Sequence, residues 1–271
     1  FKLKFGSWVG ADKDGNPFVT KNITKEALKI YSNQILNIYK EQIVQFSEEF
    51  SISTDFVESP KKLTKKIEEY KKILPNDYKH YKRVNFDEPF RIFLSLVFHR
   101  LDNFQKNKKG YKYFHEFLDD ILLFQNSVLK IFGTKIQNTK LDNFIEMVYQ
   151  FEFHGVSLDI RQNSSVINSQ SGREYLDFEE LIKEIPELQK IYGDKVFNSI
   201  ILSMTSSESD ILNLFNVCKK HMPKKNIPSI TPLIEEIEEL QKSHIILEKL
   251  FLNRQYKSFI EKFKNNNQEI M

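Results

Sequence analysis

The sequence predicts a mainly α-helical fold with a parallel β/α barrel core, a partial TIM-type (β/α)8 barrel carrying a large all-helical insertion. Apolar residues recur with a helical period over approximately residues 24–150, which marks the insertion. Outside it, short apolar runs alternate with helical segments, as parallel strands joined by helical crossovers do. Polar residues follow each run, which is typical of strand ends in a β/α barrel. About four strands are expected, half the number that closes such a barrel.

Five helices are expected in the insertion. Thr24 is expected to cap the first helix, and Pro60 to lie in the first turn of the second, which ends at Pro75. The other three are expected near residues 87–105, 113–132 and 141–151. The apolar positions that follow the helical period are Ala27, Ile30, Tyr31, Ile35, Ile38 and Phe46, then Leu63, Ile67, Tyr70 and Leu74, then Phe90, Phe93, Leu94, Val97 and Leu101.

The expected strands are short. They cover Lys2–Phe5, Gly155–Ile160, Ser199–Met204 and Ser229–Ile234, with helical segments at Phe178–Glu184 and Ser209–His221. Polar residues follow the strands at Ser7-Trp8, Arg161-Gln162, Thr205-Ser206 and Glu235-Glu236. Because the carboxyl ends of parallel strands meet at one rim, we expect Trp8, Arg161 and Glu235 to lie together.

Composition excludes several classes of protein. Apolar residues make up 40% of the chain, enough for a buried core, and the mean hydropathy of −0.46 excludes a membrane protein. No apolar run approaches the ~20 residues that span a bilayer. The net charge of +3 is small, and lysines alternate with glutamates on helix faces, so no nucleic-acid surface is expected. Cys218 is the only cysteine, which favours a reducing, cytoplasmic location.

Two segments carry most of the chemistry, the turn-rich Gly6–Pro17 and the strand end Leu158–Gln162. Lysine supplies nearly all the positive charge, so an arginine within a motif is notable. Arg161 offers a planar fork that binds a phosphate or carboxylate with two prongs, which a lysine does not. The alternative is a structural role, in which Arg161 pairs with Asp159 or another carboxylate and braces the core.

Glu235 directly follows an apolar strand, at the same expected rim. Hard cations such as Mg²⁺ choose oxygen ligands and usually take one or two carboxylates from the protein. The acidic residues that follow Glu235 are expected to complement a helix N-terminus instead. Trp8 is the only tryptophan. Its ring is expected either at the rim or, as the alternative, buried in the core. A calcium loop at Asp12–Asn16 is excluded, because the glycine comes too early and Ile23 stands at the twelfth position.

These segments closely resemble signature stretches of the phosphoenolpyruvate carboxylase family. Two further segments fit the same family in the same order, namely Pro232–Glu235 and the pair Ser203-Met204 with Ser209–Leu212. The resemblance implies that phosphoenolpyruvate and bicarbonate are converted to oxaloacetate and phosphate, through carboxyphosphate and a pyruvate enolate. It also implies a cytoplasmic homotetramer that needs Mg²⁺ or Mn²⁺.

The resemblance further implies a role for individual residues. Arg161 would bind the substrate phosphate, Glu235 would bind the metal, and Trp8 and Leu233 would form apolar walls near the substrate methylene. The sequence departs from the family at several motif positions. Asn163, Val166 and Ile167 stand where the family has glutamate, arginine and histidine, and Ala11 and Lys13 replace glycine and arginine.

The chain is expected to be an internal piece of a longer enzyme, from residue 1 to residue 271. It begins at Phe1 without a methionine, and the second metal ligand implied by the resemblance would lie beyond Met271. The catalytic histidine motif, the active-site lysine and the glycine-rich loop of the family are not found. Alone, the chain is therefore expected to be inactive. The alternative is a non-catalytic helical scaffold that keeps a relict half-barrel and acts through protein contacts.

Overall fold

The computed structural model describes residues 5–133 and 139–271 and divides them into two compact units. The sheet unit contains the chain up to Tyr31, Val156–Lys190 and Asp194–Met271. The helical unit contains Ser32–Gly155 and Ile191–Gly193. No helix in the described ranges is long and apolar enough to cross a membrane.

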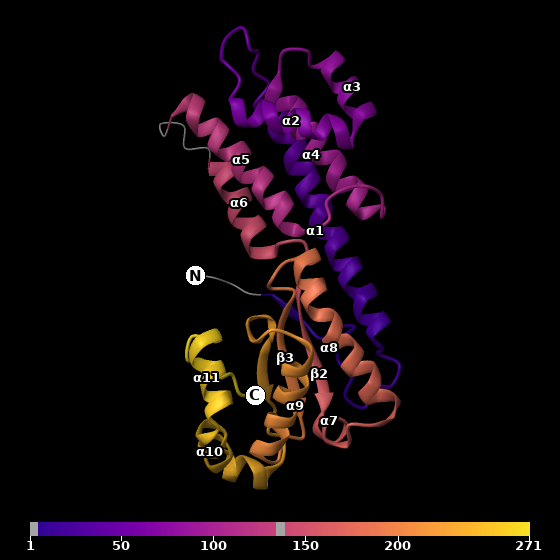
Figure 1. The fold of residues 1–271 in the computed structure, drawn as a ribbon, viewed down its shortest axis with the longest axis vertical. Coiled ribbons are helices and arrows are strands. Elements are labelled where there is room, and N and C mark those ends of the chain that lie inside the picture. Colours follow the sequence, from indigo (N-terminus) through magenta and orange to yellow (C-terminus); the bar gives the residue numbers. More distant parts are fainter. Residues whose placement is uncertain (1–4, 134–138) are drawn as a thin grey trace. The chain divides into compact units, whose positions relative to one another are not determined.

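Helices make up most of the described chain (Figure 1). They are α1 (Lys21–Glu49), α2 (Lys61–Ile73), α3 (Pro75–Val84), α4 (Pro89–Gln105), α5 (Phe114–Phe132), α6 (Thr139–Phe151), α7 (Ser164–Ser169), α8 (Gly172–Tyr192), α9 (Glu208–His221), α10 (Ile237–Leu252) and α11 (Arg254–Phe263), with a short 3₁₀ turn at Lys224–Asn226.

The sheet unit is built on four parallel strands in the order β1 (Gly6–Ser7), β2 (Ser157–Asn163), β3 (Phe197–Ser203) and β4 (Ser229–Pro232). The strands therefore follow one another in space as they do in sequence, with helical crossovers between the last three. This confirms the predicted mainly helical fold with a parallel sheet. Residues 2–4 of the strand expected at Lys2–Phe5 lie outside the described residues.

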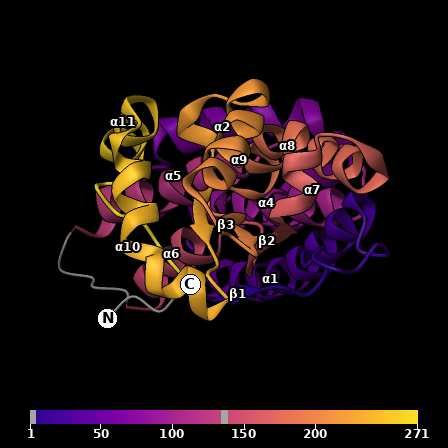
Figure 2. The same ribbon diagram turned by 90° about the horizontal axis from the view of Figure 1, so that it is seen from below.

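The two faces of β2 differ in character. Leu158 and Ile160 are fully buried, and Figure 2 shows α8 and α9 on one side of the sheet. Because side chains alternate along a strand, Asp159 and Arg161 point to the opposite face. Arg161 was expected in the loop after the strand, but β2 continues to Asn163, so Arg161 lies within the hydrogen-bonded ladder.

The segment after β1 leaves the sheet and returns to it. A turn in which Ala11 and Asp12 donate backbone hydrogen bonds to the Trp8 carbonyl, at 2.9 and 3.0 Å, lifts the chain away. The chain then pairs again with β2, since the Arg161 N–H donates to the Ala11 carbonyl and the Lys13 N–H to the Arg161 carbonyl. Gly10 makes this turn possible, because its φ of +82° is one that other residues rarely adopt.

The buried stripe of α1 differs from the predicted one. Ile30 and Ile38 are 55% and 44% exposed, so their expected place in the core was wrong. The buried positions of α1 are Thr24, Leu28, Ser32, Ile35, Leu36, Tyr39, Ile43 and Phe46. Thr24 does not cap the helix either, because α1 begins at Lys21 and the Thr24 N–H donates to the carbonyl of Thr20, the residue just before the helix.

The structure has one helix that was not predicted, α3, and one that is longer than predicted, α8, and each contains a proline. Pro75 ends α2 but also opens α3, where its missing N–H costs nothing in the first turn. Pro186 lies inside α8, which runs through it to Tyr192, well beyond the predicted end at Glu184. The predicted end of α2 before Pro75 is confirmed, whereas at Pro186 the helix continues within a packed unit.

The helical unit packs around aromatic side chains and one buried polar network. Asp120, fully buried on α5, accepts hydrogen bonds from the hydroxyls of Tyr70 and Tyr111, the latter at 2.5 Å. The guanidinium of Arg100 lies 3.9 Å from the Tyr111 ring centroid and donates to Tyr70 at 2.9 Å. Burial raises the pKa of Asp120, and the tyrosine hydrogen bonds and the nearby Lys66 oppose that rise.

Replacing Asp120 with alanine is expected to destabilise the helical unit strongly. The change leaves two buried hydroxyls without their acceptor and removes one of two carboxylates near Arg100, the other being Glu116 at 2.6 Å. We expect a cost of about 3–5 kcal/mol in the free energy of unfolding. Urea unfolding followed by circular dichroism measures it. Asp119→Ala is the matched control, because Asp119 is exposed on the same helix and should change stability by less than about 0.5 kcal/mol. Equal effects of the two changes would contradict the role of the network.

Replacing Gly10 with alanine is expected to displace the turn after β1. A Cβ at Gly10 would lie 2.5 Å from the Ala27 Cβ, whereas a Cβ at Gly15, which also has a positive φ of +65°, meets nothing within 4 Å. Both changes should cost about 1–2 kcal/mol from the backbone conformation, and Gly10→Ala about 1–3 kcal/mol more from overpacking. Urea unfolding monitored by Trp8 fluorescence compares them. Identical costs would mean that the contact with Ala27 is unimportant.

Candidate functional site

Arg161 lies at the centre of a cluster of three carboxylates in the sheet unit. Its Nη2 is 2.9 Å from Asp14 Oδ2 and 3.3 Å from Glu235 Oε1, and its Nη1 is 3.5 Å from Asp12 Oδ2. The Arg161 side chain is 18% exposed, so the cluster is partly shielded from water. Arg161 and Glu235, which are 74 residues apart in sequence, therefore meet at one edge of the sheet, as the strand order predicted.

The two aspartates are positioned by backbone geometry. Asp12 forms a parallel bridge with Arg161, which brings their side chains to the same place on the sheet. Asp14 follows in a turn in which its own N–H donates to Asp12 Oδ1 at 3.2 Å. Asn163 Nδ2 donates to Asp14 Oδ1 at 3.1 Å and holds that carboxylate from the other side.

Glu235 reaches the cluster from the end of β4. The Leu233 N–H donates to the Leu202 carbonyl at 2.9 Å, and the Leu233 carbonyl accepts from Thr205 at 3.2 Å. These bonds extend the pairing with β3 past Pro232 and fix the direction in which the chain leaves the strand. The Glu235 side chain is 33% exposed, so its carboxylate is open to a ligand from solvent while it contacts Arg161.

Trp8 joins the cluster through its ring. The Arg161 guanidinium carbon lies 5.4 Å from the Trp8 ring centroid, within the range of a cation–π contact. Trp8 is 37% exposed, so the alternative of a buried core ring was wrong. The structure thus brings together Trp8, Arg161 and Glu235. Leu233, two residues before Glu235, is half-buried, and its backbone pairs with Leu202 and Thr205.

Asp159 does not pair with Arg161. Its Oδ1 accepts hydrogen bonds from Asn198 Nδ2 at 3.0 Å and Ser199 Oγ at 2.8 Å, both on β3. The alternative in which Asp159 braces Arg161 was therefore wrong, although other carboxylates do contact the guanidinium. The arrangement is compatible with a braced arginine and also with an anion-binding one, because a fork held by carboxylates is oriented for a second acceptor.

Three residues of the site escaped the sequence interpretation. Asp12 and Asp14 were weighed only as parts of a calcium loop, and Lys13 only as a replaced arginine. Lys13 is 5% exposed and its Nζ lies 2.7 Å from Asp177 Oδ2 on α8. Burial lowers the pKa of Lys13, while the Asp177 carboxylate opposes that shift. Two charged residues flanking a third within a turn-rich motif were the available signal.

The donor chemistry of the cluster fits a hard cation in part. Its ligand atoms would be carboxylate oxygens, as Mg²⁺ and Mn²⁺ prefer. Within residues 5–133 and 139–271, however, no group of three or more His, Cys, Asp or Glu side chains is arranged to hold a metal ion. Glu235 therefore fits as a single ligand, with the remaining ligands to come from water, substrate or other parts of the polypeptide.

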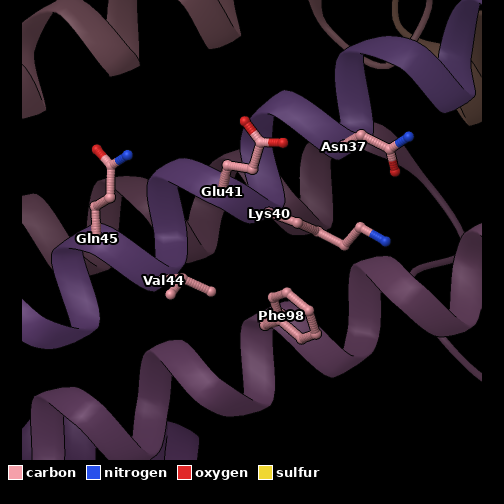
Figure 3. A pocket seen from close by; sticks show the side chains of 6 residues that line it. All are labelled: Asn37, Lys40, Glu41, Val44, Gln45 and Phe98. Atoms are coloured by element: carbon pink, nitrogen blue, oxygen red, sulfur yellow. The ribbon is translucent and has the colours of Figure 1, made fainter.

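A separate hollow of about 560 Å³ lies in the helical unit between α1 and α4 (Figure 3). Its lining consists of Asn37, Lys40, Glu41, Val44, Gln45 and Phe98. Figure 3 shows Phe98 reaching from α4 toward α1, with Lys40 beside it. The Lys40 ammonium is already paired with Asp102 at 3.2 Å. The Arg161 cluster is the stronger candidate site.

Comparison with known proteins agrees with the sequence motifs. The sequence model of the family described as "Phosphoenolpyruvate carboxylase" matches residues 1–170 and 168–271. Curated relatives of that name occur in Prochlorococcus marinus (strain MIT 9301), 26% identical over 95% of this chain, and in Nostoc sp. (strain PCC 7120), 27% identical over 91%. A third, from Rhodopseudomonas palustris (strain BisB5), is 24% identical over 99%.

This chain spans about a third of the length of these relatives, 33%, 30% and 34% respectively. The matches nevertheless cover both units and every residue of the Arg161 cluster. The chain therefore belongs to the phosphoenolpyruvate carboxylase family.

Proposed function

We propose that the protein containing this chain is a carboxy-lyase that forms oxaloacetate and phosphate from phosphoenolpyruvate and bicarbonate. The observation that carries the proposal is the meeting of Arg161, Glu235 and Trp8 at one edge of the parallel sheet, in a chain of this family. The three residues come from separate parts of the sequence. Their meeting supplies a cationic fork, an oxygen ligand and an apolar ring within one small region.

Arg161 would bind the substrate phosphate. A guanidinium can bind two oxygens of one anion in a planar, two-pronged contact. Asp12 and Asp14 hold it from the side of the Gly6–Pro17 segment, so its orientation is set before substrate arrives. Such preorganisation favours binding to a charge that develops or moves during reaction.

Glu235 would bind Mg²⁺ or Mn²⁺. The bound cation would supply polarisation of phosphate and enolate oxygens. Three carboxylates around one guanidinium make the region too negative for an anionic substrate, so a cation beside Glu235 has a clear electrostatic reason. Trp8 and Leu233 would form the apolar walls that exclude water from the substrate methylene.

We further propose that residues 1–271 are an internal part of a larger (β/α)8 barrel in a cytoplasmic homotetramer, with approximately residues 24–150 as its helical insertion. One observation supports continuation of the sheet. Met271 donates to the Pro232 carbonyl and accepts from the Ile234 N–H, both at 3.0 Å. Met271 thus bonds to the residues on either side of Leu233, which is the pattern of a parallel ladder. A further strand would therefore pair beside β4.

A non-catalytic scaffold is the second candidate function. It is favoured by the carboxylates around Arg161, which already contact both Nη atoms of the guanidinium as a structural brace would. Binding discriminates between the two, because Trp8 lies beside Arg161 and its fluorescence should change when a ligand binds there. A scaffold would show no change with phosphoenolpyruvate and Mg²⁺, even in the full-length protein.

In the full-length protein, Arg161→Lys is expected to lower kcat/KM for phosphoenolpyruvate on the order of 10- to 100-fold, ~1.4–2.7 kcal/mol, because lysine keeps the charge but loses the fork. Glu235→Ala is expected to raise the concentration of Mg²⁺ or Mn²⁺ needed for half-maximal activity. Steady-state kinetics with varied substrate and metal measures both. Glu236→Ala is the control, since Glu236 is exposed and only precedes α10. Wild-type kinetics in Arg161→Lys would refute the need for a fork.

The 271-residue chain by itself is expected to form no oxaloacetate. A family active site needs several groups held together to within a fraction of an ångström, and this chain supplies only part of the set. Oxaloacetate formation with Mg²⁺, coupled to malate dehydrogenase, provides the measurement, and metal without protein is its control. Turnover clearly above that background would show that these residues suffice.

A further inference from the structure

Lys13 is the buried anchor of the segment that carries the two aspartates. Its side chain is 3% exposed, although it lies between Asp12 and Asp14, which are both partly exposed. The Lys13 ammonium donates to Asp177 Oδ2 and to the Val19 carbonyl, each at 2.7 Å. A lysine is rarely buried unless its charge is paired, so this position is built around the ammonium group.

Asp177 links the anchor to two other elements. It lies on α8 and also accepts hydrogen bonds from the Lys21 backbone N–H, at 2.9 and 3.1 Å. Lys21 is the first residue of α1, where a carboxylate is favoured by the unpaired N–H groups of the helix start. A single carboxylate therefore ties together α8, the start of α1 and the segment that carries Asp12 and Asp14.

Lys13 is connected to Arg161 in two ways, through its backbone and through its two neighbours. The Lys13 N–H donates to the Arg161 carbonyl at 2.9 Å, so the backbone of Lys13 is part of the bridge to β2. The carboxylates of its two neighbours contact the guanidinium, at 3.5 Å for Asp12 and 2.9 Å for Asp14. If the side chain of Lys13 lost its partner, the segment that carries both carboxylates would lose its tie to α8 and keep only its contacts with β2.

We propose that Lys13 is a positioning residue, which through its ion pair with Asp177 holds Asp12 and Asp14 so that they aim the Arg161 fork at the substrate phosphate. The inference rests on the proposed function of Arg161. Lys13 touches no reacting atom in this role. Displacing a positioned group by about 1 Å can cost on the order of 100-fold in rate, so a residue that acts only through others can still matter.

The test compares Lys13→Met, Lys13→Arg and Lys25→Met in the full-length protein. Methionine removes the charge at similar length, and arginine restores it. A hollow of about 400 Å³, lined by Lys13, Gln162 and Asp177 among others, gives the larger arginine room. Lys25→Met is the matched control, because Lys25 pairs with Glu184 on α8 at the same distance, 2.7 Å, but is exposed and away from the cluster.

We expect Lys13→Met to lower kcat/KM for phosphoenolpyruvate on the order of 10- to 100-fold, and to weaken the change in Trp8 fluorescence that phosphoenolpyruvate causes. Lys13→Arg should restore most of both, and Lys25→Met should change neither. A purely structural role would lower the unfolding temperature without this selective loss. If Lys13→Met fails to fold, Asp177→Asn takes its place, because it weakens the ion pair while keeping an acceptor for Lys21.

A double-mutant cycle with Asp14→Asn tests the route. If Lys13 acts through Asp14, Lys13→Met should have much less effect on kcat/KM once Asp14 is already changed. If the wild-type protein is active, two results would overturn the positioning role and leave the proposed function standing. One is additive losses of kcat/KM in the double mutant, and the other is an equal effect of Lys13→Met and Lys25→Met on kcat/KM. A wild-type protein that neither binds nor turns over phosphoenolpyruvate would overturn the proposed function, and the positioning role with it.

Discussion

The parallel backbone bridge between Asp12 and Arg161 is the contact on which the candidate site depends. After two residues of β1 the chain leaves the sheet in a tight turn and then pairs again with β2. Both the N–H and the carbonyl of Arg161 are used in this second pairing. Asp12 is thereby placed beside Arg161, and Asp14 follows two residues later. The turn that precedes the bridge also places the ring of Trp8 close to the guanidinium.

Electrostatics gives the cluster its character. One guanidinium faces three carboxylates in a partly shielded place, so the oxygens outnumber the cation that holds them together. Such an arrangement can act as a brace, because all three carboxylates contact the guanidinium, but two negative charges are left in excess. It can also change when a ligand binds, since a ligand that binds the Glu235 carboxylate would release Nη2 of Arg161 from that contact. The same contacts can therefore serve structure and recognition.

The residues that hold the cluster in place come from distant parts of the chain, as the buried Lys13 shows. Lys13 and Asp177 are 164 residues apart in sequence, yet their pairing joins the motif segment to α8. Asn163 supports Asp14 from the end of β2, at a position where the resembled family has glutamate. An amide there donates a hydrogen bond to a carboxylate, which another carboxylate could not do unless protonated. This departure from the family pattern is thus compatible with an ordered site.

Helix periodicity predicted most of the helices correctly, because their apolar residues recur on one side. It failed for Ile30 and Ile38, since α1 carries more apolar residues than its buried stripe holds, and only the packing partners select the stripe. It also missed α3, which begins at Pro75, and the continuation of α8 past Pro186. Proline breaks a helix locally, but a first-turn position removes the cost at Pro75, and α8 continues through Pro186 within a packed unit.

The sequence by itself determined the family, the mainly helical class, the parallel sheet and the meeting of Trp8, Arg161 and Glu235 at one edge. These follow from local patterns and from strand order, which short-range propensity and parallel connection rules set. Only the tertiary structure decided that Asp12 and Asp14 surround Arg161 and that Asp177 buries Lys13. Those contacts join residues far apart in the chain, and their choice depends on the register of β2 and on where α8 packs, which no local pattern encodes.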